Sequence, residues 1–325
     1  MINLGTEPLP HPVLTNKYQL NSRFPAPFRA FVQAGLTFFW EYKAPILQPV
    51  SPASLVARTL QTVLGTSIAD YTFVDFCSGA GGPTPFIEQE VNKAFKKLSD
   101  GGNILVRNED TGANGHMNGS GDGGRGGGVD FVMTDIHPHL PEWVKASKKS
   151  KNLHYVPSPV DAANAPHDLL SMAGTQEKNK KIFRLFSLAF HHFPDPLATR
   201  ILHNTLTHSS GFAIFELQGR DLGSIFTILG MFPLLWAGSW YWFWGDWGLL
   251  FWTYVVPVVP FVLVFDGVVS SLRTRREGEV LELIRECGAS TEGWRFETGR
   301  EIHTWTGGTM NYFIGIKESG GKKMQ

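Results

Sequence analysis

The chain has 325 residues, of which 42% are hydrophobic, and its 29 basic residues balance 29 acidic ones. This length and apolar content can supply a substantial buried core. A formal net charge of zero argues against nucleic-acid binding, which needs a basic surface. Cys77 and Cys287 form neither a disulfide framework nor a zinc-ligand pattern. The N-terminal segment lacks the basic and then apolar pattern of a secretory signal, so we expect the cytosol or a membrane facing it.

The segment 1–69 is expected to form an N-terminal helical cap. Between residues 24 and 64, aromatic and aliphatic residues recur at helical spacing, and the pattern is broken at Pro45, Pro49 and Pro52. Proline ends or kinks a helix, so this pattern predicts two or three short helices that pack on the main fold.

A strand, a glycine turn and a helix follow in direct succession. The hydrophobic run Tyr71–Phe76 predicts a buried strand, and Gly79-Ala80-Gly81-Gly82 follows it. In the stretch after the glycines, Thr84 can cap a helix, Pro85 suits its first position, and the apolar residues up to 98 share one face. Glycines in this context indicate that the backbone approaches a ligand closely.

Four more strands are predicted within residues 129–136, 151–162, 180–193 and 211–219, with helical segments between most of them. This alternation predicts an α/β fold with a mainly parallel, Rossmann-like sheet and helices on both faces. The core is expected to span 70–221, with the glycine-rich stretch 100–128 as a disordered loop.

The fold is expected to resume at 267–318, before a short tail at 319–325. Residues 277–288 have the pattern of an amphipathic helix, and the two strands predicted within 293–317 are joined by Gly307-Gly308. These strands should form a C-terminal antiparallel hairpin.

An apolar insertion separates the two parts of the core. Between residues 222 and 265 the only charged residue is Asp246, and the runs Ser224–Trp244 and Trp247–Phe265 each have about the length that spans a bilayer. Six of the ten tryptophans lie in these runs, and tryptophan favours membrane interfaces.

We therefore expect 222–266 to form an apolar helical hairpin that associates with a membrane. The basic stretch 271–277, "SLRTRRE", would then place the catalytic domain on the cytosolic side. The alternative is a cytoplasmic protein in which the insertion is a buried lid over a hydrophobic pocket.

The spacing of the glycines distinguishes the ligand classes that bind at such a turn. A phosphate loop needs Gly-Lys-Ser/Thr, which is absent here. A dinucleotide fingerprint needs three spaced glycines, but in one register the first position is Cys77 and in the other the third is Thr84. Nicotinamide dinucleotides are therefore disfavoured.

Asp75 followed by Gly79-Ala80-Gly81-Gly82 resembles the first motif of class I (seven-stranded, Rossmann-like) S-adenosylmethionine (SAM)-dependent methyltransferases. "FVMTDIHPHL" is similar to the second motif, in which an acidic residue ends the second strand; here it is Asp135, with Ile136 beside it. A carboxylate suits this position because it accepts from two hydroxyl groups at once. Cys77 departs from the family pattern, in which glycine is common.

Two further motifs extend the resemblance over residues 70–221 and 277–317. "YVPSPVDAANAP" is similar to the third motif and contains Asp161 and Ala162. "FSLAFHHFPDPLATRIL" is similar to the fourth-strand motif and contains His191 and His192.

The resemblance implies SAM as the cofactor. Gly79 and Gly81 would lie against its methionine and ribose portions, and Asp75 would help to hold its amino group. Asp135 would bind the ribose hydroxyls, and Asp161 would accept from the adenine amino group.

Other polar residues are candidates for chemistry or for substrate binding. His191 or His192 can act as a base on an acceptor hydroxyl, since histidine titrates near neutrality. Glu216 and Gln218 follow the fifth strand, at the edge where open sheets bind ligands, and can orient a substrate. His137 and His139 are expected to contact adenine or solvent, and no metal is expected.

These features predict a SAM-dependent methyltransferase for a small lipophilic acceptor such as a lipid, a terpenoid or a polyketide-like molecule, with O-methylation as one option. Two alternatives stay open. One is a non-enzymatic, membrane-associated protein with a degenerate methyltransferase fold, and the other is an NAD(P)-dependent reductase.

Overall fold

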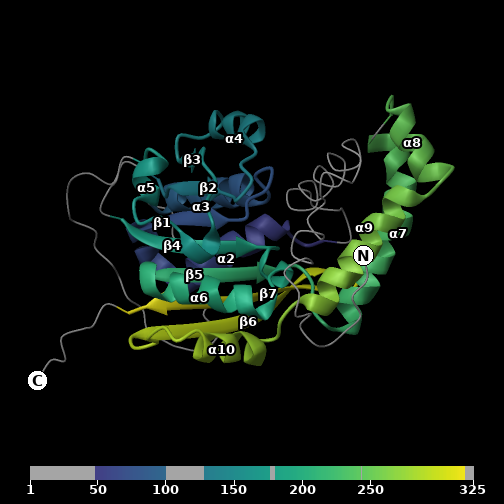
Figure 1. The fold of residues 1–325 in the computed structure, drawn as a ribbon. Helices are drawn as coiled ribbons and strands as arrows, with labels where there is room; N and C mark the ends of the chain where they lie inside the picture. The colour runs from purple at the N-terminus through teal and green to yellow at the C-terminus, as the bar shows by residue number, and fades with distance from the viewer. Residues whose placement is uncertain (1–47, 100–127, 176–179, 243, 319–325) are drawn as a thin grey trace, which may run out of the picture.

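The computed structural model describes residues 48–99, 128–175, 180–242 and 244–318. Its centre is a seven-stranded sheet with the order β3-β2-β1-β4-β5-β7-β6 (Figure 1). The strands that pair in parallel are β1 (Tyr71–Phe76), β2 (Phe131–Thr134), β3 (Leu153–Tyr155), β4 (Lys181–Ser187) and β5 (Gly211–Glu216). The predicted mainly parallel sheet is confirmed.

The sheet closes with an antiparallel hairpin, as predicted. β7 (Gly308–Lys317) inserts between β5 and β6 (Trp294–Thr304) and runs antiparallel to both. β1 and β5 are buried along their whole length. This explains why these strands appear in the sequence as continuous apolar runs, because strands covered on both faces need no polar alternation.

Helices cover both faces of the sheet. One face packs against α2 (Pro52–Leu64), α3 (Thr84–Ser99) and α4 (Leu140–Ser147), with Leu60, Ile87 and Trp143 in its core. The opposite face packs against α5 (Leu169–Met172), α6 (Asp195–His208) and α10 (Glu277–Glu286). Three short 3-10 helices complete the core: η1 (Gly65–Asp70), η2 (Ala162–Asn164) and η3 (Phe190–His192).

Parts of the expected organisation lie outside the described residues. Of the N-terminal cap, the structure describes α2, which Ser51 caps through its hydroxyl and which begins with Pro52, as well as η1. The helices expected before residue 48, the glycine-rich loop up to residue 127 and the tail 319–325 are not described.

The insertion forms a protrusion of three helices, α7 (Leu222–Trp242), α8 (Trp247–Tyr254) and α9 (Val258–Arg273). It begins just after the carboxyl end of β5 and stands to one side of the sheet, with α8 at its far end (Figure 1). We call Leu222–Arg273 the apolar protrusion.

The second apolar run differs from its expected form. It is divided between α8 and α9 at residues 255–257, where Pro257 precedes α9, and α9 continues beyond residue 266 to Arg273. Proline lacks the N–H that would continue the helix, which accounts for the break. Neither α8 nor α9 therefore has the length of a bilayer span.

Within the described part of the chain, α7 is the one helix long and apolar enough to cross a membrane, judged by length and composition alone. Its candidate window covers Leu222–Tyr241, and 22% of that window is buried in the protein. Much of the apolar side-chain surface of α7 therefore has no protein partner among the described residues.

Candidate functional site

The turn after β1 contains several residues in the left-handed backbone region. The φ angles are +52° at Gly79, +110° at Gly81 and +49° at Gly82, which glycine adopts without strain. Cys77 also has a positive φ, of 68°, where a side chain is unfavourable. A Cβ atom built at Gly79 would meet no atom of the described residues within 4 Å, so among these residues the turn faces open space here.

Asp135 lies directly against this turn. Its Oδ2 accepts from the Gly79 backbone N–H at 2.9 Å, and its Oδ1 accepts from the His137 N–H at 2.8 Å. β1 and β2 are neighbours, so the parallel sheet brings these groups together although 56 residues separate Gly79 from Asp135. A carboxylate has about four lone-pair positions, so Asp135 retains acceptor capacity for a ligand.

Asp75 lies behind the turn and is buried. Its Oδ2 accepts from the hydroxyl of Thr84, a residue expected to cap the following helix, and its Oδ1 has no hydrogen-bond partner among the described residues. Burial raises the pKa of Asp75 to about 7, while bonds from Thr84 and Ser78 act in the opposite direction. A cationic group placed here would satisfy the free oxygen.

The third predicted motif lies at the same edge of the sheet. The Asp161 side chain is exposed and accepts from the Ala163 N–H at 2.8 Å, which caps η2, while Ala162 is buried. The carbonyl of Asp135 accepts from the Val160 N–H at 2.9 Å, which holds this loop beside the second motif. Ile136 is 45% exposed at the same place.

Cys77 lies among the three carboxylates of these motifs. Burial raises the pKa of the Cys77 thiol well above its usual value, and the charges of Asp135, Asp75 and Asp161 raise it further. All three predicted acids therefore lie close enough to Cys77 to raise the pKa of the same thiol.

Trp143 was not predicted as part of this site. It lies on α4, is fully buried, and its indole Nε1–H donates to the Gly79 carbonyl at 2.8 Å. This bond fixes the carbonyl side of the turn while Asp135 holds the N–H side. The helical periodicity of 140–147 indicates only that Trp143 is buried, and no local signal reveals its partner.

His191 and Glu216 form a buried pair at the carboxyl ends of β4 and β5. The His191 Nδ1 lies 2.7 Å from Glu216 Oε2, and the His191 backbone N–H donates to Oε1 at 3.1 Å. Both side chains are almost inaccessible to solvent. The structure therefore places the Glu216 carboxylate, expected to orient a substrate, against His191.

His192 lies beside this pair and is exposed. Its ring centroid is 4.0 Å from that of His191. Electrostatic repulsion from His191 holds the pKa of His192 well below its usual value, and desolvation of the ring and the Arg273 guanidinium lower it further. The His192 ring is therefore neutral near pH 7. Gln218, two residues after Glu216, is buried, and its backbone carbonyl accepts from Asn311 Nδ2 at 3.1 Å.

Arg275 fixes the turn that carries the two histidines, and it too was missed. Its guanidinium donates to the Phe190 carbonyl at 2.9 Å, to the Phe193 carbonyl at 2.5 Å and to Asp195 Oδ1 at 2.6 Å. Arg275 belongs to the basic stretch 271–277, which was expected to face a membrane surface, but its guanidinium binds groups within the protein. Arg275 also lies just after α9, so it links the base of the apolar protrusion to η3.

Comparison with known proteins gives distant structural likenesses only. No family model matches the chain, and no curated protein matches it. One solved structure that it resembles is the CurJ carbon methyltransferase, with 10% identity over 82% of this chain and 54% of that one and a TM-score of 0.42. A second is LepI in complex with SAM, with 12% identity over 94% of this chain and 54% of that one and a TM-score of 0.40. A third is magnesium protoporphyrin IX methyltransferase (ChlM) from Synechocystis PCC 6803 with bound SAM, with 7% identity over 94% of this chain and 96% of that one and a TM-score of 0.43.

The chain spans about half the length, 54%, of the first two of these proteins. Likeness at this level of identity assigns no activity and no residue role to the present chain.

Proposed function

We propose that the chain is a SAM-dependent methyltransferase. The observation that carries the proposal is the meeting of the glycine turn with the acid of the second strand, through the bond from Gly79 N–H to Asp135. The turn itself faces open space, and behind it Asp75 has a buried oxygen without a partner in the described part of the chain. This arrangement suits a ligand that carries both an ammonium group and hydroxyl groups.

The residues of the site fit SAM part by part. Asp75 would accept from the ammonium group of the methionine portion, and this pairing would keep the Asp75 carboxylate ionised. Asp135 would accept from the ribose hydroxyls, and the exposed Asp161 and Ile136 would lie along the adenine. The bound cofactor supplies an electrophilic methyl group, and the protein then has to position the acceptor.

The pair formed by His191 and Glu216 supports O-methylation. Nδ1 of His191 lies against a carboxylate, and the tautomer that donates from Nδ1 to Glu216 would leave a lone pair on Nε2 for the acceptor proton. Nε2 would accept the proton of the acceptor hydroxyl, while SAM, held by Asp75 and Asp135, would supply the methyl group and keep the carbon–sulfur bonding pair on its sulfur. Glu216 orients the ring and stabilises the imidazolium that forms.

The apolar protrusion supports a lipophilic acceptor and docking on a membrane. It begins at the carboxyl edge of the sheet, where the candidate site also lies. Its outer part exposes the aromatic side chains of Trp240, Trp244 and Trp247, which are 54%, 60% and 67% accessible. Aromatic side chains of this kind partition to the interface between lipid and water, so we propose that the protrusion brings the site to its acceptor at a membrane surface.

The test is methyl transfer from labelled SAM to a panel of lipophilic alcohols and phenols in detergent micelles. The wild-type chain should methylate at least one of them, and Glu216→Gln should reduce kcat by about 100-fold or more while leaving SAM affinity unchanged. SAM binding without product from any acceptor would favour the non-enzymatic alternative. NADP binding that displaces SAM would favour a reductase.

A further inference from the structure

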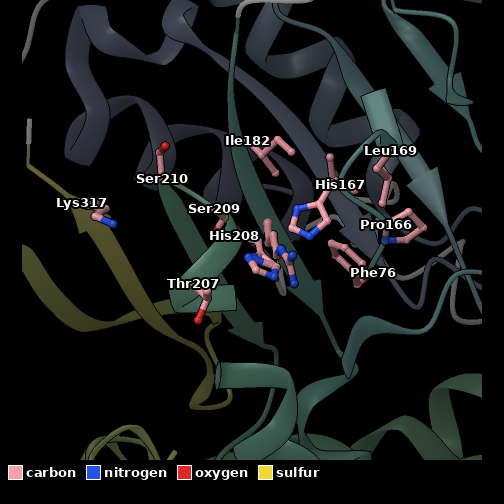
Figure 2. A pocket seen from close by; sticks show the side chains of 12 residues that line it. Phe76, Pro166, His167, Leu169, Ile182, Thr207, His208, Ser209, Ser210 and Lys317 are labelled. Carbon is pink, nitrogen blue, oxygen red and sulfur yellow. The ribbon is translucent and has the colours of Figure 1, made fainter. Parts of the chain in front are cut away.

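A cavity of about 360 Å³ is lined by none of the residues of the proposed cofactor site. It is lined by residues at the starts of β4 and β5, including Ile182 and Ser210, and by Lys317 at the end of β7. Ile182, Ser210 and Lys317 mark the amino edge of the parallel strands, and from there the cavity extends along the sheet to Val74 and Phe76 of β1. Gly79 and Asp135 follow the carboxyl ends of β1 and β2 and do not line it. We call this space the amino-edge cavity; Figure 2 shows it from close by.

Arg184 of β4 is the unusual residue of this cavity. Its side chain points to the α6 face of the sheet, and the residue is only 3% exposed. Its Nη1 donates to the Thr205 hydroxyl at 3.3 Å, while the buried Nε has no partner among the described residues. Its guanidinium carbon lies 4.8 Å from the centroid of the Phe76 ring, which offsets part of the cost of burying a charge.

The charge of Arg184 has no counter-ion in the described part of the chain. Burial lowers the pKa of Arg184 to about 10, so the guanidinium still carries its charge at neutral pH. An unpaired buried charge is costly, and a guanidinium has five donors, of which Thr205 uses one. The site therefore has unused capacity for an anion.

The other polar residues of the cavity are neutral or basic. His167, His208 and Lys317 line it together with Arg184, and none of its described lining residues is acidic. The rings of His167 and His208 lie beside each other (Figure 2), with centroids 4.4 Å apart and ring planes inclined at 52°. Burial, together with His167, Arg184 and His203, lowers the pKa of His208, which shows that the surroundings disfavour a further positive charge.

We propose that the amino-edge cavity binds a small oxyanion, a carboxylate or a phosphate group, with Arg184 as its principal partner. The fork of the guanidinium can donate two parallel hydrogen bonds to such a group. Val74, Leu169 and Ile182 also line the space, so a short apolar part can accompany the anion. The proposal is independent of the methyltransferase function, because none of the residues assigned to SAM lines this cavity.

The test is calorimetric titration of the full chain with inorganic phosphate and, separately, with butyrate, at constant ionic strength and with chloride as the reference salt. At least one of the two should bind the wild type. In Arg184→Met the affinity should fall at least tenfold. Arg200→Met, which removes an exposed arginine of α6 that does not line the cavity, should bind as the wild type does. Phosphate binding alone identifies a phosphate site, and butyrate binding alone identifies a carboxylate site.

A second readout does not depend on the folding of a variant. Nuclear magnetic resonance of the wild-type protein should show that the bound anion raises the pKa of His208, because it neutralises the charge of Arg184. Three results would overturn the proposal: neither probe binds, the affinity is unchanged in Arg184→Met, or the bound anion does not change the pKa of His208.

Discussion

The buried carboxylate of Asp75 lowers the stability of the folded protein at neutral pH, and in the proposed site it binds the ammonium group of SAM. Its carboxyl is buried with one oxygen unpartnered among the described residues, and its pKa is raised to about 7. The folded state therefore holds a proton between pH 3.8 and about 7, where the unfolded state has released it. The stability that this proton provides is present at low pH and is lost as the pH rises through this window.

Asp75→Asn removes the ionisable group while keeping an oxygen for Thr84. At pH 8 we expect the ligand-free variant to unfold at a higher temperature than the wild type, because a buried charge costing up to about 4 kcal/mol is gone. SAM affinity should fall in the same variant, since the carboxylate that would receive the ammonium is lost. Thermal unfolding and calorimetry check the two effects, and an unchanged SAM affinity would contradict the role given to Asp75.

The pH dependence of cofactor binding follows from the same group. In the proposed binding mode SAM pairs with the Asp75 carboxylate, so below pH 7 the protein would first have to release a proton from it. The affinity should therefore fall by up to tenfold for each pH unit below about 7. Calorimetric titrations between pH 5.5 and 8 check this expectation, and Asp75→Asn should remove most of the slope.

Trp143 anchors the glycine turn by a single buried hydrogen bond. Trp143→Phe keeps an aromatic ring but leaves the Gly79 carbonyl without this donor, so the free energy of unfolding should fall by about 1 to 3 kcal/mol. Trp294→Phe is the matched control, because the Trp294 indole N–H has no partner among the described residues. Urea unfolding of both variants measures the difference; equal losses would mean that the hydrogen bond contributes little.

At the scale of elements, Arg275 couples the end of α9 to η3. Arg275→Lys keeps the charge but cannot reproduce the guanidinium contacts with Phe190, Phe193 and Asp195. Because the turn carrying His191 would loosen, kcat should fall by about tenfold or more, with SAM affinity unchanged. A variant with normal kcat would show that these contacts do not position the turn for catalysis.

The sequence allowed the strands, the glycine turn and the three carboxylates to be predicted because each has a local signal. Continuous apolar runs predict buried strands. The resemblance to the methyltransferase motifs is what selected Asp75, Asp135 and Asp161 as candidates for cofactor binding. Trp143 and Arg275 carry no such signal, since their roles depend on contacts with Gly79 and Phe190 from distant segments. Pro257 predicts a kink in the second apolar run, but hydropathy does not show that this run divides there into two separate helices, α8 and α9.

At the scale of the whole molecule, the protrusion is the feature that sets this chain apart from a bare seven-stranded core. Trp240, Trp244 and Trp247 gather near its outer end, with ring centroids 4.4 Å apart for the first pair and 5.8 Å for the second. If this end enters a lipid interface, replacing all three with serine should reduce partition into phospholipid vesicles by at least tenfold.

The matched control for the membrane experiment is Trp305→Ser. Trp305 is 68% exposed but lies in the turn between β6 and β7, outside the protrusion. Flotation with vesicles should leave this variant bound as firmly as the wild type. Wild-type protein that stays unbound, or a triple variant that still floats, would favour the soluble lid instead.

The central claim is that the edge formed by Gly79, Asp75 and Asp135 binds SAM. It is tested most directly by calorimetric titration of SAM into the detergent-purified chain, its Asp135→Ala variant and the control Asp70→Ala, which removes an exposed acid at the opposite edge. The account predicts binding to the wild type and to the control, with a loss of at least tenfold in Asp135→Ala. Absence of binding to the wild type, or equal affinity in all three proteins, would contradict it.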